Sequence, residues 1–212
     1  MSILVLAPHP DDEVLGCGGT IAKYAKAGEK VIVAVFSSGA GSHPLHKEHV
    51  IIKTRKEEAE EVHRTLGVKE TIFFMLDDFN FKQELVDKEI ILKLYDIVKK
   101  EKPTKIFMPA LDDTHAHHRA VGRIALQMHS QYSLRCSLYT YSIWNPLSLL
   151  KRSQPRLVVD VSAEQQQKTQ AYRLYKSQWV SLYQLVPIVT LKSFFAGLRY
   201  GCRWAEVFIQ LK

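Results

Sequence analysis

The sequence predicts an α/β protein with a three-layer, Rossmann-like, doubly wound fold and a mostly parallel sheet. Short apolar runs rich in β-branched residues alternate with longer segments of helical periodicity, from the N-terminus to about residue 130. This alternation is typical of βαβ units, in which each helix crosses between two parallel strands. The first apolar run shows no alternation of polar residues, as expected for a strand that is covered on both faces.

Turn and stop residues bound the expected elements. Gly28 and Gly67 follow two helical segments and Pro103 follows a third, and all three are common positions for a helix to end. Ser162 is a candidate N-cap of a later helix. Strands are expected over residues 3–7, 30–36, 70–75, 105–109, 137–143 and 157–161, helices over 20–27, 54–66, 83–101, 119–129 and 163–176, and loops over 8–19 and 37–49.

Length and composition narrow the class of protein. A chain of 212 residues suits one domain that spans residues 1–212. The net charge of +7 is spread along the chain without a long basic run or a nucleic-acid motif, so no nucleic-acid partner is expected. The number of cysteines is odd, at 3, and they form no C-x-x-C pair, which favours a reducing, cytoplasmic location.

Neither a signal peptide nor a transmembrane segment is expected. The N-terminus lacks the basic start and long apolar stretch of a signal peptide. Later apolar stretches, such as LVPIVTL, look too short to span a bilayer. The apolar and aromatic tail over residues 179–212 could belong to the core, form an oligomer contact or lean on a membrane. Core or oligomer contact is the favoured interpretation, and a homo-oligomer stays open.

Two clusters of metal-type side chains follow two of the expected strands. The first is P-H-P-D-D-E over residues 8–13, and the second is D-D-T-H-A-H-H-R over residues 112–119. Imidazole nitrogens and carboxylate oxygens suit zinc or a related divalent ion. Loops at the carboxyl ends of parallel strands share one edge of the sheet, where ligands bind in such folds. The alternative is that both clusters are solvated loops with local turns.

The motifs resemble those of the LmbE/PIG-L family of N-acetylglucosamine deacetylases. APHPDDEVLGCGGTIA is similar to the family's A-H-P-D-D-E opening and its following G-x-G-G-T. TRKEEAEEVHRTLG and DDTHAHHRAV are similar to its R-x-x-E-A helix and its D-x-H-x-D-H-R segment. GCRWAEVFIQL resembles a late G-x-x-x-A-E-x-F element. The matches stand in the family's order along nearly the whole chain.

This resemblance implies a zinc-dependent hydrolase that removes an N-acetyl group from an N-acetylglucosamine-type sugar or conjugate. It assigns the metal, Zn²⁺ or another divalent ion, to His9, Asp12 and His118. Asp11 matches the general base that activates the attacking water at the metal. His115 matches the residue that steadies the oxyanion.

Three further residues take supporting roles in the same comparison. Arg55 matches a helix arginine associated with substrate binding. Asp113 matches the aspartate before the loop's first histidine, and it could orient His115 or cap the loop. His117 departs from the family, which usually has Asp at that position, so the orientation of a ligand or a substrate contact could differ.

Other interpretations remain beside the leading one. An amidase that cleaves a larger acyl group would keep the metal, whereas a sugar- or nucleotide-binding Rossmann-like module would have no catalysis. The glycines at 16, 18 and 19 do not complete a G-x-G-x-x-G motif, so tight packing is favoured for them. Glu13 could contact the site or favour a helix N-terminus. His43, His46 and His49 suggest a second metal, although solvated or substrate-facing histidines are favoured.

Overall fold

The computed structural model describes residues 1–42, 48–143 and 154–212. Its strands are β1 (Ser2–Ala7), β2 (Lys30–Ser37), β3 (Glu70–Leu76), β4 (Lys105–Pro109), β5 (Ser137–Tyr141), β6 (Arg156–Asp160) and β7 (Ala205–Gln210). Its α-helices are α1 (Asp12–Lys26), α2 (Glu48–Leu66), α3 (Phe81–Leu85), α4 (Lys88–Glu101), α5 (Ala116–Gln131), α6 (Gln165–Leu174) and α7 (Trp179–Tyr200). Short 3₁₀ turns lie at Ala40–Ser42 and Lys176–Gln178.

The strands form one sheet in the order β3-β2-β1-β4-β5-β7-β6. The five strands from β3 to β5 are parallel, whereas β7 runs antiparallel to both of its neighbours. From β1 the chain winds outward through β2 and β3, and then returns to the other side of β1 for β4 and β5. This reversal places the topological switch point between β1 and β4. The predicted doubly wound, mostly parallel fold is therefore confirmed.

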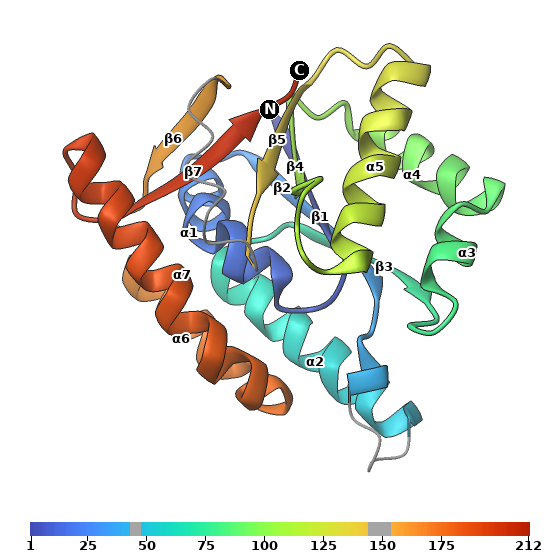
Figure 1. The fold of residues 1–212 in the computed structure, drawn as a ribbon, viewed down its shortest axis with the longest axis horizontal. Coiled ribbons are helices and arrows are strands. Elements are labelled where there is room, and N and C mark those ends of the chain that lie inside the picture. Colours follow the sequence, from blue (N-terminus) through green and yellow to red (C-terminus); the bar gives the residue numbers. More distant parts are fainter. Residues whose placement is uncertain (43–47, 144–153) are drawn as a thin grey trace.

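Two apolar cores lie on opposite faces of the sheet, and β1 contributes to both. Leu4 and Leu6 point to one core, whereas Ile3, Val5 and Ala7 point to the other. Helices α3, α4 and α5 cover the first face, and α1, α2, α6 and α7 cover the second (Figure 1). β1 is buried along its whole length. This burial on both faces explains why its sequence is apolar throughout and does not alternate with polar residues.

Four local predictions were wrong, and the first concerns α2, which begins at Glu48 although a loop was expected over residues 37–49 and a helix only from residue 54. Helix α1 begins at Asp12 rather than near residue 20, and a non-helical Cys17 (φ −148°) divides it into two parts. The single helix expected over residues 83–101 is two helices, because Asp87 caps α4 by accepting a hydrogen bond from the Glu89 amide at 2.9 Å. Ser162 does not cap α6, since its hydroxyl donates to Asp160 at 2.6 Å instead.

The glycines in α1 permit close packing. A Cβ at Gly16 would lie 2.3 Å from the Tyr141 ring, and one at Gly19 would lie 2.8 Å from Val161. Both distances are too short for a real side chain. The glycines thus allow tight packing, as the sequence suggested, although they lie in a helix and not in a loop.

The tail contains two elements that sequence patterns did not resolve, α7 and the antiparallel strand β7. Residues Lys176–Tyr200 form a helical stretch of 25 residues that contains an 18-residue window with mean hydropathy 1.3, so by length and composition alone it could cross a membrane. The expectation that the apolar stretches are too short for this was wrong, because Pro187 does not end the helix. However, α7 packs on the sheet through Leu182, Leu185 and Val189.

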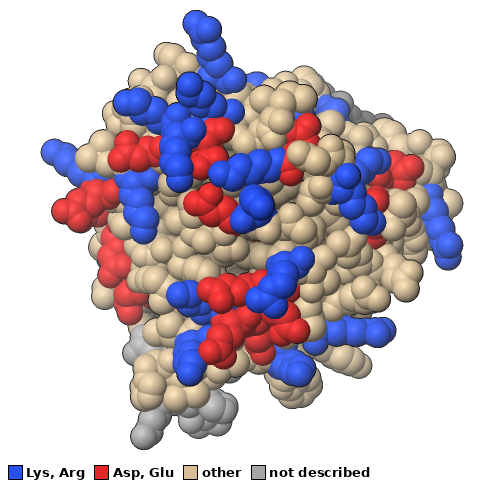
Figure 2. Space-filling view, turned by 180° about the vertical axis from the view of Figure 1, so that it is seen from behind, with Lys and Arg blue, Asp and Glu red and all other residues tan. Residues whose placement is uncertain are grey.

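Charged side chains are mixed on the face opposite to that of Figure 1. Figure 2 shows Lys and Arg lying among Asp and Glu there, with an acidic group in the lower half that is bordered by basic side chains. The excess positive charge is therefore not gathered into one continuous surface on that face.

A buried ion pair joins α1, α6 and β7. Lys168 lies 2.5 Å from Glu206, which also accepts hydrogen bonds from the Gly19 and Thr20 amides at 3.0 and 2.8 Å. Because both charges are buried, Glu206→Ala leaves an uncompensated lysine. We expect urea unfolding to show a loss of about 3–5 kcal/mol in the free energy of unfolding. Glu57→Ala, which removes an exposed ion pair of 3.9 Å, is the control and should change it by less than about 1 kcal/mol.

Candidate metal centre

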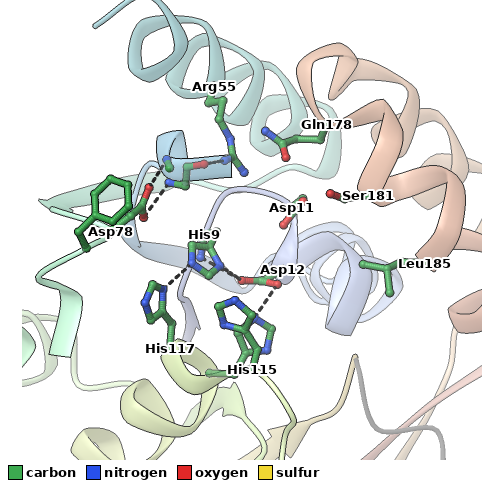
Figure 3. Close-up of a pocket in the computed structure, with 14 residues that line it drawn as sticks. His9, Asp11, Asp12, Arg55, Asp78, His115, His117, Gln178, Ser181 and Leu185 are labelled. Atoms are coloured by element: carbon green, nitrogen blue, oxygen red, sulfur yellow. Dashed lines mark hydrogen bonds and ion pairs between the residues drawn. The ribbon is translucent and has the colours of Figure 1, made fainter. Parts of the chain in front are cut away.

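The two histidine- and aspartate-rich segments meet at one edge of the sheet. The first follows β1 and the second follows β4, and these strands are parallel neighbours. Their carboxyl ends therefore lie side by side, and Figure 3 shows His9, Asp12, His115 and His117 gathered there. The expectation that both segments share an edge is confirmed.

His9, Asp12 and His118 bring three donor atoms together. Asp12 lies between the two imidazoles, with one oxygen 3.1 Å from His9 Nδ1 and the other 3.1 Å from His118 Nε2. One potential ligand atom from each residue lies within 4.8 Å of the other two. Asp12 and His118 are buried, and the donor set of two imidazoles and one carboxylate suits a divalent ion such as zinc.

The electrostatics of this trio depend on its close spacing. Burial opposes ionisation of Asp12, but the His118 and His9 imidazoles hold the pKa of this carboxyl well below its usual range. Burial likewise favours neutral His118, yet the Asp12 and Asp113 carboxylates raise the pKa of His118 to about 10. A bound cation would take the place of that proton, because ligation requires the neutral imidazole.

Asp11 lies beside the trio without joining it. Its carboxyl group lines the same pocket, and burial, followed by the neighbouring Asp12 carboxylate, raises its pKa well above the usual value. Its backbone has φ 110°, a conformation that non-glycine residues rarely adopt. Such strain persists only where surrounding contacts hold it in place.

Glu13 supplies one of those contacts. This fully buried carboxylate accepts a hydrogen bond from the Asp11 amide at 3.2 Å and another from the Tyr175 hydroxyl at 2.6 Å. It also lies 3.2 Å from His63 Nε2. Glu13 is therefore an anchor beneath the turn that carries Asp11, rather than a residue that lines the pocket.

Asp113 supports the other segment. One of its oxygens lies 3.3 Å from His118 Nδ1, on the side of the ring away from Asp12. The other accepts a hydrogen bond from the His115 amide at 2.9 Å. Asp113 thus contacts both histidines through one carboxylate. A carboxylate behind a ligating histidine is a common way to orient its ring.

His117 contacts the far side of His9. Its Nδ1 lies 2.9 Å from His9 Nε2, and its ring stacks on Phe81 with centroids 4.1 Å apart. Burial, followed by the interaction with the neighbouring His9, lowers the pKa of both His115 and His117 to about 4. Together with His9, these two histidines make a second group of potential ligand atoms within 4.8 Å.

These residues line a pocket of about 290 Å³. Arg55, expected as a substrate-binding residue, borders it but is almost wholly buried, and its guanidinium donates to the carbonyl oxygens of Gly39 and Pro10. Burial lowers the pKa of Arg55, although the Asp11 and Asp78 carboxylates oppose this. Arg55 therefore ties together two loops of the pocket.

Several lining residues were missed by sequence reasoning. They are Asp78 and Phe79 after β3, and Gln178, Ser181 and Leu185 at the start of α7 and just before it. Asp78 accepts hydrogen bonds from the Gly39 and Gly41 amides at 3.2 and 2.8 Å. The signal for Asp78 was available, since D-D directly follows a strand that ends at the same edge. No local pattern pointed to the α7 residues.

The histidines between β2 and α2 do not belong to the described site. His49 lies in the first turn of α2 and is exposed, as expected for a solvated residue. His43 and His46 lie outside the described residues.

Comparison with known proteins identifies the family. Residues 4–129 match the family described as PIG-L: GlcNAc-PI de-N-acetylase. The chain belongs to the PIG-L family. The resemblance recognised in its motifs is thereby confirmed, and the match includes both segments of the candidate metal centre.

Relatives and solved structures are similar to nearly the whole chain. The diacetylchitobiose deacetylase of Thermococcus kodakarensis is 26% identical over 96% of this chain and 80% of its own length. The N,N'-diacetylchitobiose deacetylase of Pyrococcus horikoshii, solved with an inhibitor, has a TM-score of 0.81 at 24% identity and covers 99% of this chain and 83% of its own. GalB, a 4-carboxy-2-hydroxymuconate hydratase of Pseudomonas putida, reaches 0.85 at 20% identity, covering 100% and 96%. Since a hydratase shares the PIG-L architecture, the reaction has to be inferred from the site.

His117 stands where the motif resemblance leads one to expect Asp. If His9 binds metal through Nδ1, its Nε2–H donates to His117, which replaces the usual carboxylate. We expect His117→Ala to weaken Zn²⁺ binding about 10–100-fold, measured by competition with a chromogenic chelator. His117→Asp restores an acceptor and should bind zinc at least as tightly as the wild type. Equal affinity in all three proteins would show that this contact does not support the metal.

Proposed function

We propose that this chain is a metal-dependent hydrolase, one domain over residues 1–212, that removes the N-acetyl group from an N-acetylglucosamine-type sugar or conjugate. The observation that carries the proposal is that potential ligand atoms of His9, Asp12 and His118 converge in one pocket. The Asp11 carboxylate lines the same pocket but does not belong to this ligand group. Membership of the PIG-L family and the similarity to a diacetylchitobiose deacetylase support it.

The trio provides three protein ligands, the number typical of catalytic zinc sites, which keep a position open. When bound, Zn²⁺ or another divalent ion supplies Lewis-acid chemistry, since it polarises a carbonyl group and makes water more acidic. Behind the ligands, Asp113 orients His118 and His117 orients His9, through the contacts of 3.3 and 2.9 Å.

Asp11 is assigned the proton transfers. Its carboxylate accepts a proton from the attacking water and delivers it to the nitrogen of the leaving amine, so that one residue serves as base and then as acid. The strained backbone and the hydrogen bond to Glu13 hold Asp11 in place for both steps.

His115 is assigned the oxyanion. It lies next to His118, with ring centroids 4.9 Å apart, and lines the pocket. A hydrogen bond from its ring to the developing negative oxygen would stabilise the tetrahedral state, an effect of about 3–4 kcal/mol for one well-placed donor.

The rest of the pocket suits a sugar. Asp78, Gln178 and Ser181 offer polar groups for hydroxyls, whereas Phe79 and Leu185 offer apolar surface for the ring face. A volume of about 290 Å³ lies just below the range of typical small-molecule sites, which begins at about 300 Å³. We therefore propose that one sugar ring occupies the pocket and that the remainder of a conjugate extends outside it.

The test combines metal analysis with product analysis. Purified protein is assayed for bound metal, then incubated with diacetylchitobiose and a panel of N-acetylglucosamine conjugates while free acetate and new primary amine are measured. Equal amounts of both products support the proposal. Release of a longer acid from an N-acyl conjugate, without acetate, would identify the amidase alternative. Binding of the sugars without metal and without hydrolysis would identify a binding module and sink the proposal.

A further inference from the structure

The outward side of α7 exposes an unusual concentration of apolar side chains. Of the 14 large hydrophobic residues that are exposed among the described residues, 8 lie on this helix, so the apolar surface is local and not scattered. Its members recur at helical spacing along one side of the helix. We name this surface the α7 outer face: Val180, Tyr183, Ile188, Leu191, Phe195 and Leu198, with exposed fractions of 54, 79, 45, 56, 62 and 61%.

The opposite side of α7 is fixed to the domain. Leu182, Leu185, Val189 and Ala196 are buried against the sheet and its neighbouring helices. Gly197 packs so closely that a Cβ would lie 2.6 Å from the backbone of Arg203. Crossing a bilayer would require α7 to give up these contacts. A helix held in this way can instead lie flat on an interface, with its outer face directed into it.

The charged residues next to this surface in the sequence are all basic, although Glu58 of α2 accepts hydrogen bonds from Ser177 at the N-terminal end of the helical stretch. No Asp or Glu occurs in residues 165–205. Arg173 and Lys176 are exposed before the helix, and Arg199 and Arg203 are exposed at and beyond its C-terminal end. The apolar face is therefore bordered at both ends by cations with no acidic residue near them in the sequence.

This arrangement distinguishes between two ways of covering the face. A second copy packed antiparallel would place the Arg173 and Lys176 end against the Arg199 and Arg203 end, so like charges would meet. An anionic lipid surface instead attracts both ends, each exposed basic residue near it adding about 1 kcal/mol. Trp179, Tyr183 and Tyr200 stand near the helix ends, and Trp and Tyr favour the membrane–water interface.

We propose that the α7 outer face is a docking surface for an anionic lipid bilayer, on which the helix lies in the plane of the interface. Gln178, Ser181 and Leu185, at the start of the same helical stretch, line the pocket of the candidate metal centre (Figure 3). Docking would bring that pocket close to the headgroup layer. The surface itself does not depend on which reaction the pocket performs.

The experiment is sedimentation of the full chain with vesicles, without substrate. Vesicles of phosphatidylcholine containing 30% phosphatidylserine are compared with pure phosphatidylcholine at low and high salt. We expect the wild type to bind the anionic vesicles, at least tenfold better than the neutral ones, and to lose binding as salt rises. Leu191→Glu with Phe195→Glu should weaken binding at least tenfold, and Arg199→Gln or Arg203→Gln about fivefold each.

Leu92→Glu is the matched control, because Leu92 is a 51% exposed leucine on α4, on the other face of the sheet. It should bind like the wild type, and circular dichroism of every variant checks that the fold is kept. Absence of wild-type binding to anionic vesicles would overturn the proposal. So would a wild-type dimer that the α7 double variant converts to monomer, since the face would then join two copies. Acetate release is measured separately in free solution, so either result leaves the proposed reaction to its own test.

Discussion

Asp11→Ala is expected to keep its metal and to lose almost all turnover. The carboxylate lines the pocket beside the His9, Asp12 and His118 donors but contributes no atom to that group, so its removal leaves the ligands intact. Loss of a general base typically reduces kcat by about 10²–10⁴. The measurement pairs metal content per chain with the rate of acetate release from the substrate found in the panel.

Asp112→Ala is the matched control for this prediction. Asp112 is an exposed aspartate at the same edge of the sheet that does not line the pocket, and its variant should retain the wild-type rate within about twofold. Asp11→Asn separates proton transfer from volume, because the amide fills the same space without accepting the proton. Wild-type turnover in either Asp11 variant would remove this residue from the mechanism.

The fold and the central residues of the site could be predicted because each depends on a strong local pattern. Buried parallel strands have no polar alternation, so β1 and β4 could be recognised from the sequence, and parallel strands end at one edge. That rule alone brought His9 and His118 together across more than a hundred residues. The motif resemblance then chose His118 from the three histidines of its segment.

What could not be predicted depends on contacts between distant parts of the chain. Glu13 reads as a first-turn acid of a helix, but the structure places it beneath Asp11, against His63 and Tyr175. The motif resemblance predicts Arg55 to bind substrate, and no local pattern predicted that its guanidinium is buried and donates to the carbonyl oxygens of two loops. In both cases the contacting residues are far away in the sequence, so no local sequence pattern predicts the contact.

The α7 residues show the same limit in another form. Pro187 and the mixture of aromatic and polar residues interrupt the apolar pattern, so the tail could not be assigned to a single helix. In the fold this helix is continuous, and it closes one side of the pocket with Ser181 and Leu185. Packing on the sheet determines which side of α7 is buried, and this packing is visible only in the folded structure.

His118→Ala should lose the metal together with the activity. His118 provides one of the three converging donors and is almost completely buried, so water cannot replace it without also disturbing the neighbouring carboxylates. Loss of a direct ligand is expected to reduce zinc affinity by more than the roughly 10–100-fold that outer partners contribute. Dialysis against a mild chelator, followed by metal analysis, measures this directly.

His129→Ala provides the comparison on the same helix. His129 lies in the last turn of α5, away from the pocket, and its ring contacts the Cys136 carbonyl at 2.9 Å. We expect this variant to keep both metal and turnover, which would exclude a general effect of removing a histidine from α5.

His118→Ala also leaves Asp12 and Asp113 without the imidazole between them, so mutual repulsion should lower the free energy of unfolding at neutral pH. Acidification protonates these carboxylates and should narrow the difference in stability from the wild type, whereas added zinc should restore little of it. Retention of stoichiometric zinc by His118→Ala would place the metal elsewhere, and the second histidine group, formed by His9, His115 and His117, would then be the site to test.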